Sequence, residues 1–237
     1  MVKNTLCVLA VAMASNSVLA ADSHWYVGVD VLNTNANQKN TLESKSQVLV
    51  PAGTVSSVPF PVTVVTTETE KFSDLSSETG FGIHVGTQFL LASQFALAVE
   101  AEYLSFGSFS GNHVYTVTDA GVVSGVNVYQ ETDTVSYSQE VEVTATNLNI
   151  KPKYYFGGNN FYLGAIAGVG VYKVDLKLDD GSDWGFNYGV EAGYEITPEL
   201  TFSAGYRMFT TSIDVKDTDQ DFELELDSFY AGLDYKF

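Results

Sequence analysis

Eight stretches of this 237-residue chain alternate apolar residues with polar residues or glycine at a period of two. A period of two places successive side chains on opposite faces of a β-strand, whereas a helix needs a period near 3.6. The last stretch, SFYAGLDYKF, shows the pattern clearly, because every second residue from Phe229 to Phe237 is apolar or aromatic. The eight stretches are 24–32, 80–90, 95–104, 146–156, 161–173, 184–196, 200–208 and 228–237. The sequence therefore predicts an all-β fold.

The faces opposite the apolar ones collect glycines and charges. Twelve of the 20 glycines lie there: Gly28, Gly80, Gly82, Gly86, Gly164, Gly168, Gly170, Gly185, Gly189, Gly193, Gly205 and Gly232. The polar residues on these faces are Asp30, His84, Glu100, Glu102, Asn147, Asn149, Lys151, Lys153, Asn187, Glu191, Arg207 and Asp234. A soluble β-sandwich has no reason to gather glycine on its solvated face, since glycine weakens strands. The narrow interior of an eight-stranded barrel does have such a reason.

Aromatic residues gather at the two ends of the predicted strands. One end holds Phe89, Phe95, Tyr154, Phe156, Phe161, Tyr194, Tyr235 and Phe237, and the other holds Tyr103, Trp184, Phe186 and Phe229. Two aromatic belts around an aliphatic band are typical of strands that face lipid. Lipid offers no hydrogen bonds to a free sheet edge, so the last strand must close on the first. We expect a closed antiparallel transmembrane β-barrel.

The connections alternate in length. Three are short, at 92–94, 157–160 and 197–199, and four are long, at 33–79, 105–145, 174–183 and 209–227. Short periplasmic turns and long external loops alternate in this way in outer-membrane barrels, and both termini then lie in the periplasm. The first two long loops contain β-branched alternating segments that could form external hairpins, or could raise the strand number from eight to ten. Pro152 lacks a ladder donor, so we expect a β-bulge there.

The first twenty residues have the pattern of a secretory signal peptide. Lys3 precedes an apolar run from Leu6 to Ala14, and a small-residue cleavage site ends at Ala20. The run is too short to span a bilayer as a helix. We therefore divide the chain into a signal peptide, residues 1–20, and a barrel domain, residues 21–237. The only cysteine, Cys7, leaves with the signal peptide, so the mature chain contains no disulfide.

The formal net charge is −18, from 29 acidic and 11 basic residues. Nucleic acid needs a basic surface, so we exclude it as a partner. Acids cluster in the third and fourth long loops, but Asp217, Asp219 and Asp221 lack the glycine and distant glutamate of a calcium loop. We therefore expect a solvated acidic surface and assign no metal site.

Catalytic chemistry finds little support in the sequence. The three histidines are His24, His84 and His113, and no phosphate loop or Cys/His metal spacing occurs. His24 precedes the first strand, His84 points into a narrow interior, and His113 lies in a loop beside acids. We predict no catalytic residue, no cofactor and no enzymatic activity.

Two stretches resemble known outer-membrane barrels. SFYAGLDYKF resembles their closing strand, whose terminal aromatic residue is the signal read by the barrel-assembly machinery. HWYVGVDVL (24–32) resembles the opening strand of the small barrels of the OmpA and OmpX type. The resemblance implies an outer-membrane location, with lipid, lipopolysaccharide and the assembly machinery as partners. We expect a monomer. The chain ends at Phe237, so we do not expect the peptidoglycan-binding domain of OmpA.

Two functions fit such a barrel. The first is a structural or surface-recognition role, in which acidic loops meet divalent cations, lipopolysaccharide, host surfaces or phage. The alternative is a small diffusion channel, and a lipid or peptide hydrolase built around His113 is a weaker third. The interior distinguishes the first two, because paired charges plug a lumen and unpaired charges line a pore. We predict that Glu100 and Glu102 pair with Lys151. We also predict that Glu191 pairs with Arg207, since an unpaired buried charge is costly.

The signal-peptide assignment makes a direct prediction. The mature N-terminus should be Ala21, and the protein should fractionate with outer membranes. N-terminal sequencing of the membrane-extracted protein checks both points. A mature protein that retains Met1, or a soluble cytoplasmic pool, would contradict the assignment.

The last residue should matter more for assembly than for the finished barrel. Phe237 is one rim aromatic residue among many, so its packing contribution is small. Deleting Phe237 should lower the amount of folded barrel in cells, while the purified chain still refolds in detergent. Normal cellular assembly of the shortened chain would remove the targeting interpretation.

Overall fold

The computed structural model describes residues 23–38, 41–52, 60–73, 75–157, 160–176, 179–214 and 221–237. The predicted signal peptide and the carboxylates of Asp217 and Asp219 lie outside the described residues. Within the described ranges, no helix is long and apolar enough to cross a membrane. All ten regular elements in these ranges are β-strands, which confirms the all-β prediction.

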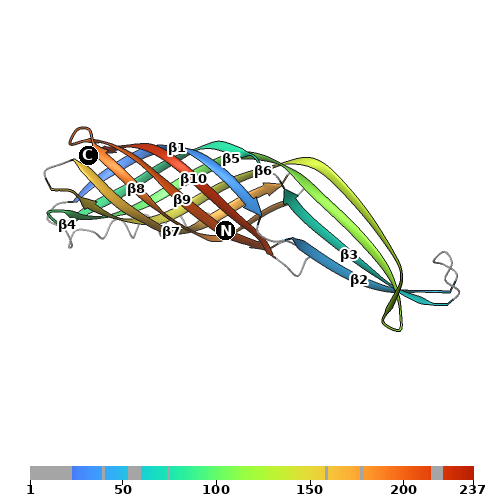
Figure 1. Cartoon of the computed structure of the whole chain (residues 1–237). Coiled ribbons are helices and arrows are strands. Elements are labelled where there is room, and N and C mark those ends of the chain that lie inside the picture. Colours follow the sequence, from blue (N-terminus) through green and yellow to red (C-terminus); the bar gives the residue numbers. More distant parts are fainter. Residues whose placement is uncertain are drawn as a thin grey trace.

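The strands form one antiparallel sheet that closes on itself (Figure 1). Their bounds are β1 (Ser23–Gln38), β2 (Leu42–Val50), β3 (Val62–Ser73), β4 (Ser77–Ala92), β5 (Phe95–Val123), β6 (Val126–Tyr155), β7 (Phe161–Leu176), β8 (Asp179–Glu195), β9 (Leu200–Asp214) and β10 (Asp221–Lys236). The order is β2-β3-β5-β4-β1-β10-β9-β8-β7-β6, and an additional β5–β6 pairing closes a ring of eight strands. The eight-stranded barrel is confirmed.

The ring closes where the first strand meets the last. β1 pairs with β10 from Tyr26–Lys236 to Gln38–Leu224. The backbone N–H of Phe237 also donates to the carbonyl of Trp25 at 2.9 Å. Both ends of the barrel domain therefore lie at the end with the short turns, as predicted. We call the opposite end, where the long connections lie, the external end.

The stretches predicted as long loops are largely extended strands. β5 and β6 contain 29 and 30 residues, whereas about ten residues suffice for a strand to cross a bilayer. β3 pairs with the far part of β5, from Thr63–Val122 to Ser73–Asn112, and β2 pairs with β3. β2, β3, residues 111–123 of β5 and residues 126–140 of β6 thus form a four-stranded projection, which we call the external sheet (Figure 1).

The alternative of a ten-stranded barrel is therefore not realised. β4 pairs with β5 only as far as Phe81–Ser105, and β3 takes that side of β5 from Asn112 onward. β2 and β3 consequently continue the sheet beyond the ring and do not widen it. The alternating β-branched segments of the first two loops predicted the hairpins correctly.

The two faces of the wall separate as the period of two predicts. On β1, Val27, Val29 and Val31 are 44%, 56% and 60% exposed on the outside, whereas Asp30 is 4% exposed. All twelve polar residues predicted to face inward are at most 6% exposed. Glycine provides the space: a Cβ on Gly193 would lie 2.2 Å from the ring of Tyr162. At such glycines the interior side chains therefore reach the backbone of the barrel wall.

Both predicted aromatic belts lie on the outside. At the short-turn end Phe95, Tyr154 and Phe156 form a chain of ring contacts with centroid distances of 5.0 and 5.2 Å. Nearer the external end, Trp184 and Phe229 are 63% and 64% exposed. This arrangement fits a wall whose two rims lie at the two headgroup levels of a membrane.

The prediction of a β-bulge at Pro152 is wrong. The pairs Ile150–Ala167 and Lys153–Gly164 keep the same register, so no residue is inserted. The ladder toward β7 omits residues 151 and 152, while Leu97 and Pro152 remain partners on the other side. The missing N–H of proline removes a ladder contact without shifting the strand. The β5–β6 ladder shifts register at two other places, between Ser105 and Ser108, beside Gly107 with its φ of 94°, and between Gly121 and Val122.

Candidate functional site

The barrel interior consists of a polar layer and an apolar layer. On β5, the inward residues Glu100 and Glu102 are followed toward the external end by Leu104, Phe106 and Phe109. The same order recurs around the ring. The apolar layer contains Leu32, Ala36, Leu42, Leu104, Phe106, Phe109, Val141, Val143, Ala145, Ile166, Tyr172, Val174, Phe209, Leu224, Leu226 and Tyr230. Sequence reasoning missed this layer, because eleven of its sixteen residues fall in stretches predicted to be loops.

One ion pair in the polar layer spans the full width of the barrel. Arg207 on β9 donates to both carboxylate oxygens of Glu102 on β5, at 2.6 and 2.9 Å. β5 and β9 are four strands apart in either direction around the ring, so they lie opposite each other. Arg207 also donates to the side-chain carbonyl of Asn187 at 2.9 Å. A bidentate bond of this kind fixes both side chains in one geometry.

The predicted Glu191–Arg207 bridge is wrong. In the β8–β9 register Arg207 faces Gly189, and Glu191 faces Gly205, two residues away. Because Gly189 has no side chain, the guanidinium is free to extend across the lumen. Among the described contacts, Glu102 is bonded by Arg207, so the predicted Glu102–Lys151 pair does not form either.

The predicted Glu100–Lys151 bridge is confirmed, with an N–O distance of 2.8 Å. Lys151 also lies 3.7 Å from Glu191, and Lys153 lies 3.5 Å from the other oxygen of Glu191. Tyr230 donates to Glu191 at 2.8 Å. These contacts join β5, β6, β8 and β10 through buried charges.

Asparagines connect the two sets of ion pairs. Asn149 donates to Glu102 at 2.9 Å and to Glu100 at 3.3 Å, and Asn187 donates to Asn149 at 3.1 Å. Asn147 donates to Glu102 at 3.4 Å. The polar layer is thus a connected network with charges of both signs, which is the arrangement expected of a plug.

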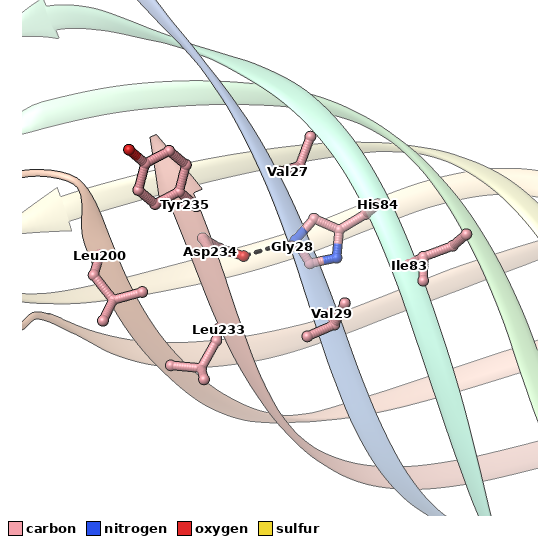
Figure 2. A pocket seen from close by; sticks show the side chains of 9 residues that line it. All are labelled: Val27, Gly28, Val29, Ile83, His84, Leu200, Leu233, Asp234 and Tyr235. Atoms are coloured by element: carbon pink, nitrogen blue, oxygen red, sulfur yellow. Dashed lines mark hydrogen bonds and ion pairs between the residues drawn. The ribbon is translucent and has the colours of Figure 1, made fainter. Parts of the chain in front are cut away.

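His84 lies between two aspartates from two other strands. Figure 2 shows its contact with Asp234. Its Nδ1 is 3.1 Å from Asp30 on β1, and its Nε2 is 2.7 Å from Asp234 on β10. Sequence reasoning placed all three residues in the lumen but did not bring them together. The residue that could have indicated this contact is Gly28, because it is the register partner of both His84 and Asp234 and has no side chain to separate them.

The same histidine belongs to a group with metal-ligating side chains. Three atoms that could bind a metal lie within 4.8 Å of one another, one each from Asp30, His84 and Glu102. Ligands bound at 2.0–2.2 Å to one transition-metal ion lie at most about 4.4 Å apart. Each of the three groups is also already ion-paired within the protein. The geometry therefore fits a network of ion pairs better than a metal centre.

His113, the residue on which a hydrolase would depend, lies on the external sheet. Its Nδ1 is 2.6 Å from the hydroxyl of Tyr137, and its Nε2 is 3.5 Å from Glu70. A serine or aspartate hydrolase needs its histidine beside a hydroxyl nucleophile or an aspartate that activates water. The two contacts described above are a tyrosine hydroxyl and a glutamate carboxylate, which differ from the serine hydroxyl and the aspartate of those enzymes.

A hollow of about 360 Å³ lies on the lipid-facing side of the wall, over the β1–β10 seam (Figure 2). It is lined by Val27, Gly28, Val29, Ile83, His84, Leu200, Leu233, Asp234 and Tyr235. Apart from the glycine and the His84–Asp234 pair behind it, the lining is apolar or aromatic.

Comparison with known proteins agrees with this architecture. The family model described as outer membrane protein beta-barrel domain matches residues 115–237, more than half of the chain. No curated protein matches. Among solved structures, Neisserial surface protein A is 14% identical with a TM-score of 0.44, over 91% of this chain and 99% of that one. OprG of Pseudomonas aeruginosa is 14% identical with a TM-score of 0.41, over 92% and 98%.

A third solved structure is Ail of Yersinia pestis in complex with the heparin analogue sucrose octasulfate. It is 9% identical with a TM-score of 0.42, over 91% of this chain and 99% of that one. The lipid-facing wall, the closed ring and the family match lead to one conclusion. The chain belongs to the outer membrane protein beta-barrel domain family and is a protein of the bacterial outer membrane.

Proposed function

We propose that the protein is a closed, non-conducting barrel that holds a rigid recognition sheet above the outer membrane. The bidentate Arg207–Glu102 bond across the full width of the lumen is the observation that carries the closed state. Phe106, Phe109 and Phe209, each at most 1% exposed, fill the interior above it. A hydrated ion would have to break the bond and then cross an apolar layer, and both steps are costly.

The external sheet carries most of its acidic residues on one face. Glu68 aligns with Val117 and Asp133 across the sheet, and the next row aligned on the same face contains Asp119 and Glu131. Asp119 and Glu131 are direct cross-strand partners, and like charges in that position are destabilising. Partial burial and the neighbouring Glu68 carboxylate raise the pKa of Tyr115, a partly exposed aromatic residue of this face.

The opposite face of the external sheet is rich in threonine. Thr67, Thr118 and Thr132 form one row, and Thr69, Thr116 and Thr134 form the next. The hydroxyl groups of the β5–β6 pairs are 3.1 and 3.2 Å apart. Lys45 aligns with this face. The two faces therefore present different chemistry, and the acidic face favours a positively charged partner or one bridged by divalent cations.

The external sheet also has a free edge. β7 pairs with β6 only up to Val141, so residues 126–140 of β6 have a strand partner on one side within the described chain. Exposed edges of this kind can accept an extended peptide as an additional strand. Lipopolysaccharide, host surfaces and phage proteins are the partners that reach this height above a membrane, and recognition of one of them is our proposed role. We assign no catalytic role.

Replacing Arg207 with Ala tests the closed lumen. The substitution leaves Glu102 buried without its charge partner, so the free energy of unfolding should fall by roughly 3–5 kcal/mol. Wild-type protein should show no steady conductance in planar bilayers, and the variant should leak. Lys173→Ala is the control, because the Lys173–Asp175 pair is about half exposed and should matter little for either measurement. Steady wild-type conductance that Arg207→Ala leaves unchanged would support the diffusion channel instead.

Neutralising the acidic face tests the recognition role. A variant with Glu68→Gln, Asp119→Asn, Glu131→Gln and Asp133→Asn should assemble normally, since these side chains lie outside the barrel wall. Cells carrying it should bind fewer polylysine-coated beads than wild type, and salt should reduce the difference. Glu43→Gln with Lys45→Gln is the control on the other face, because it leaves the net charge unchanged. Equal bead binding by wild type and both variants would contradict recognition through this face.

A further inference from the structure

We infer that His84 is a proton-dependent latch on the seam where the first strand of the barrel meets the last. The imidazole extends from β4 and contacts Asp30 on β1 and Asp234 on β10. β1 and β10 are the two strands that close the ring. One ring therefore joins three consecutive strands across the closure.

The protonation state of His84 decides whether the latch holds both strands. An ionised carboxylate only accepts hydrogen bonds, and a neutral imidazole donates from one nitrogen while a protonated one donates from both. The side chains of His84, Asp30 and Asp234 are 2%, 3% and 9% exposed, so water is a poor substitute for a lost partner. Removing the proton leaves one aspartate without a donor from the ring.

Two glycines in the seam strands make room for the latch. A Cβ on Gly28 of β1 would lie 2.2 Å from Nε2 of His84 and 2.3 Å from a carboxylate oxygen of Asp234. A Cβ on Gly232 of β10 would lie 2.0 Å from Asp30. Glycine weakens a strand interior. Both closing strands thus contain a weakening residue at the positions where the latch needs space.

The groups around the ring favour its protonated form. Besides the two aspartates, Glu100 on β5 lies 3.8 Å from Nε2, and Tyr26 on β1 contacts the ring edge-on at 6.0 Å. Glu100 in turn binds the ammonium group of Lys151 on β6. Glu102, which is paired with Arg207 on β9, places an oxygen within 4.8 Å of a ring nitrogen, so four carboxylates face one imidazole. An opposite charge stabilises the cation. Within the described polar layer His84 is the only histidine, because His24 lies nearer the short-turn end of β1, opposite Gln88.

The outside of the seam is thin at the same place. The lipid-facing hollow lies over Gly28, with His84 and Asp234 among its lining residues (Figure 2). At Gly28 no side chain separates the latch from the hollow. The ladder of β1 and β10 therefore depends on the latch from inside, and deprotonation of His84 should loosen this pair of strands before the others.

Hydrogen exchange tests the latch in the refolded chain, residues 21–237, in lipid nanodiscs. After correction for intrinsic exchange, raising the pH from neutral to strongly alkaline should reduce protection of the β1–β10 amides and spare those of β8–β9. His84→Gln should show weakly protected β1–β10 amides at both pH values. Equal loss of protection in both strand pairs, or a His84→Gln variant that behaves as wild type, would overturn the inference.

A disulfide across the seam separates a latch from a general packing contact. Val29→Cys with Leu233→Cys joins partners on β1 and β10, and Val190→Cys with Tyr206→Cys joins partners on β8 and β9. In the His84→Gln background the first pair should restore the wild-type urea midpoint, and the second should not. If His84→Gln does not fold alone, folding restored only by the seam disulfide gives the same support. Equal rescue by both disulfides, or rescue by neither, would overturn the latch.

Discussion

The absence of hydrogen-bond partners in lipid is the constraint on which the structure depends. Every backbone N–H and C=O in the membrane must pair within the sheet, so the sheet must close. Closure joins β1 to β10 and gives the chain a lipid-facing outside and a narrow inside. Charged residues cannot point outward, so they are confined within a space that eight strands leave barely wide enough for side chains. Pairing of charges across that space then becomes necessary.

The external sheet shows what happens where this constraint ends. Above the membrane, water can form hydrogen bonds with the backbone. β2 and β3 can therefore lie outside the ring, and the outer part of β6 needs no strand partner on its second side. The same two strands, β5 and β6, therefore serve two purposes. Their lower halves belong to the closed wall, and their upper halves present a two-faced sheet. The sealed barrel that we propose beneath such a sheet would provide a rigid base, which agrees with recognition more than with transport.

The period of two was sufficient to predict the eight strands of the ring and the inward face of the charges in the polar layer. It was not sufficient to predict which charges pair. Glu191 and Arg207 sit at similar heights on neighbouring strands, but the register places Gly189 opposite Arg207. A long side chain beside a glycine can cross the lumen, and the partner on the far wall, Glu102, belongs to a strand more than one hundred residues earlier in the sequence.

The other incomplete or wrong predictions have similar causes. For β2 and β3 the sequence predicts either an external hairpin or two additional strands of the ring. The choice between these two depends on how far β4 extends along β5. Pro152 was expected to distort the strand, but the loss of one donor was tolerated without a shift of register. The contacts of His84 required the pairing of three strands around Gly28, and no single segment contains that information.

The interaction between Glu102 and Arg207 is the most direct test of the account. A double-mutant cycle with Glu102→Gln and Arg207→Met measures their coupling free energy from the unfolding of wild type, both single variants and the double variant. Pairs that share a buried network show coupling of about 0.5–3 kcal/mol, and we predict a value near the upper end. A coupling near zero would mean that the two charges act independently in a water-filled lumen, which would contradict the plugged barrel.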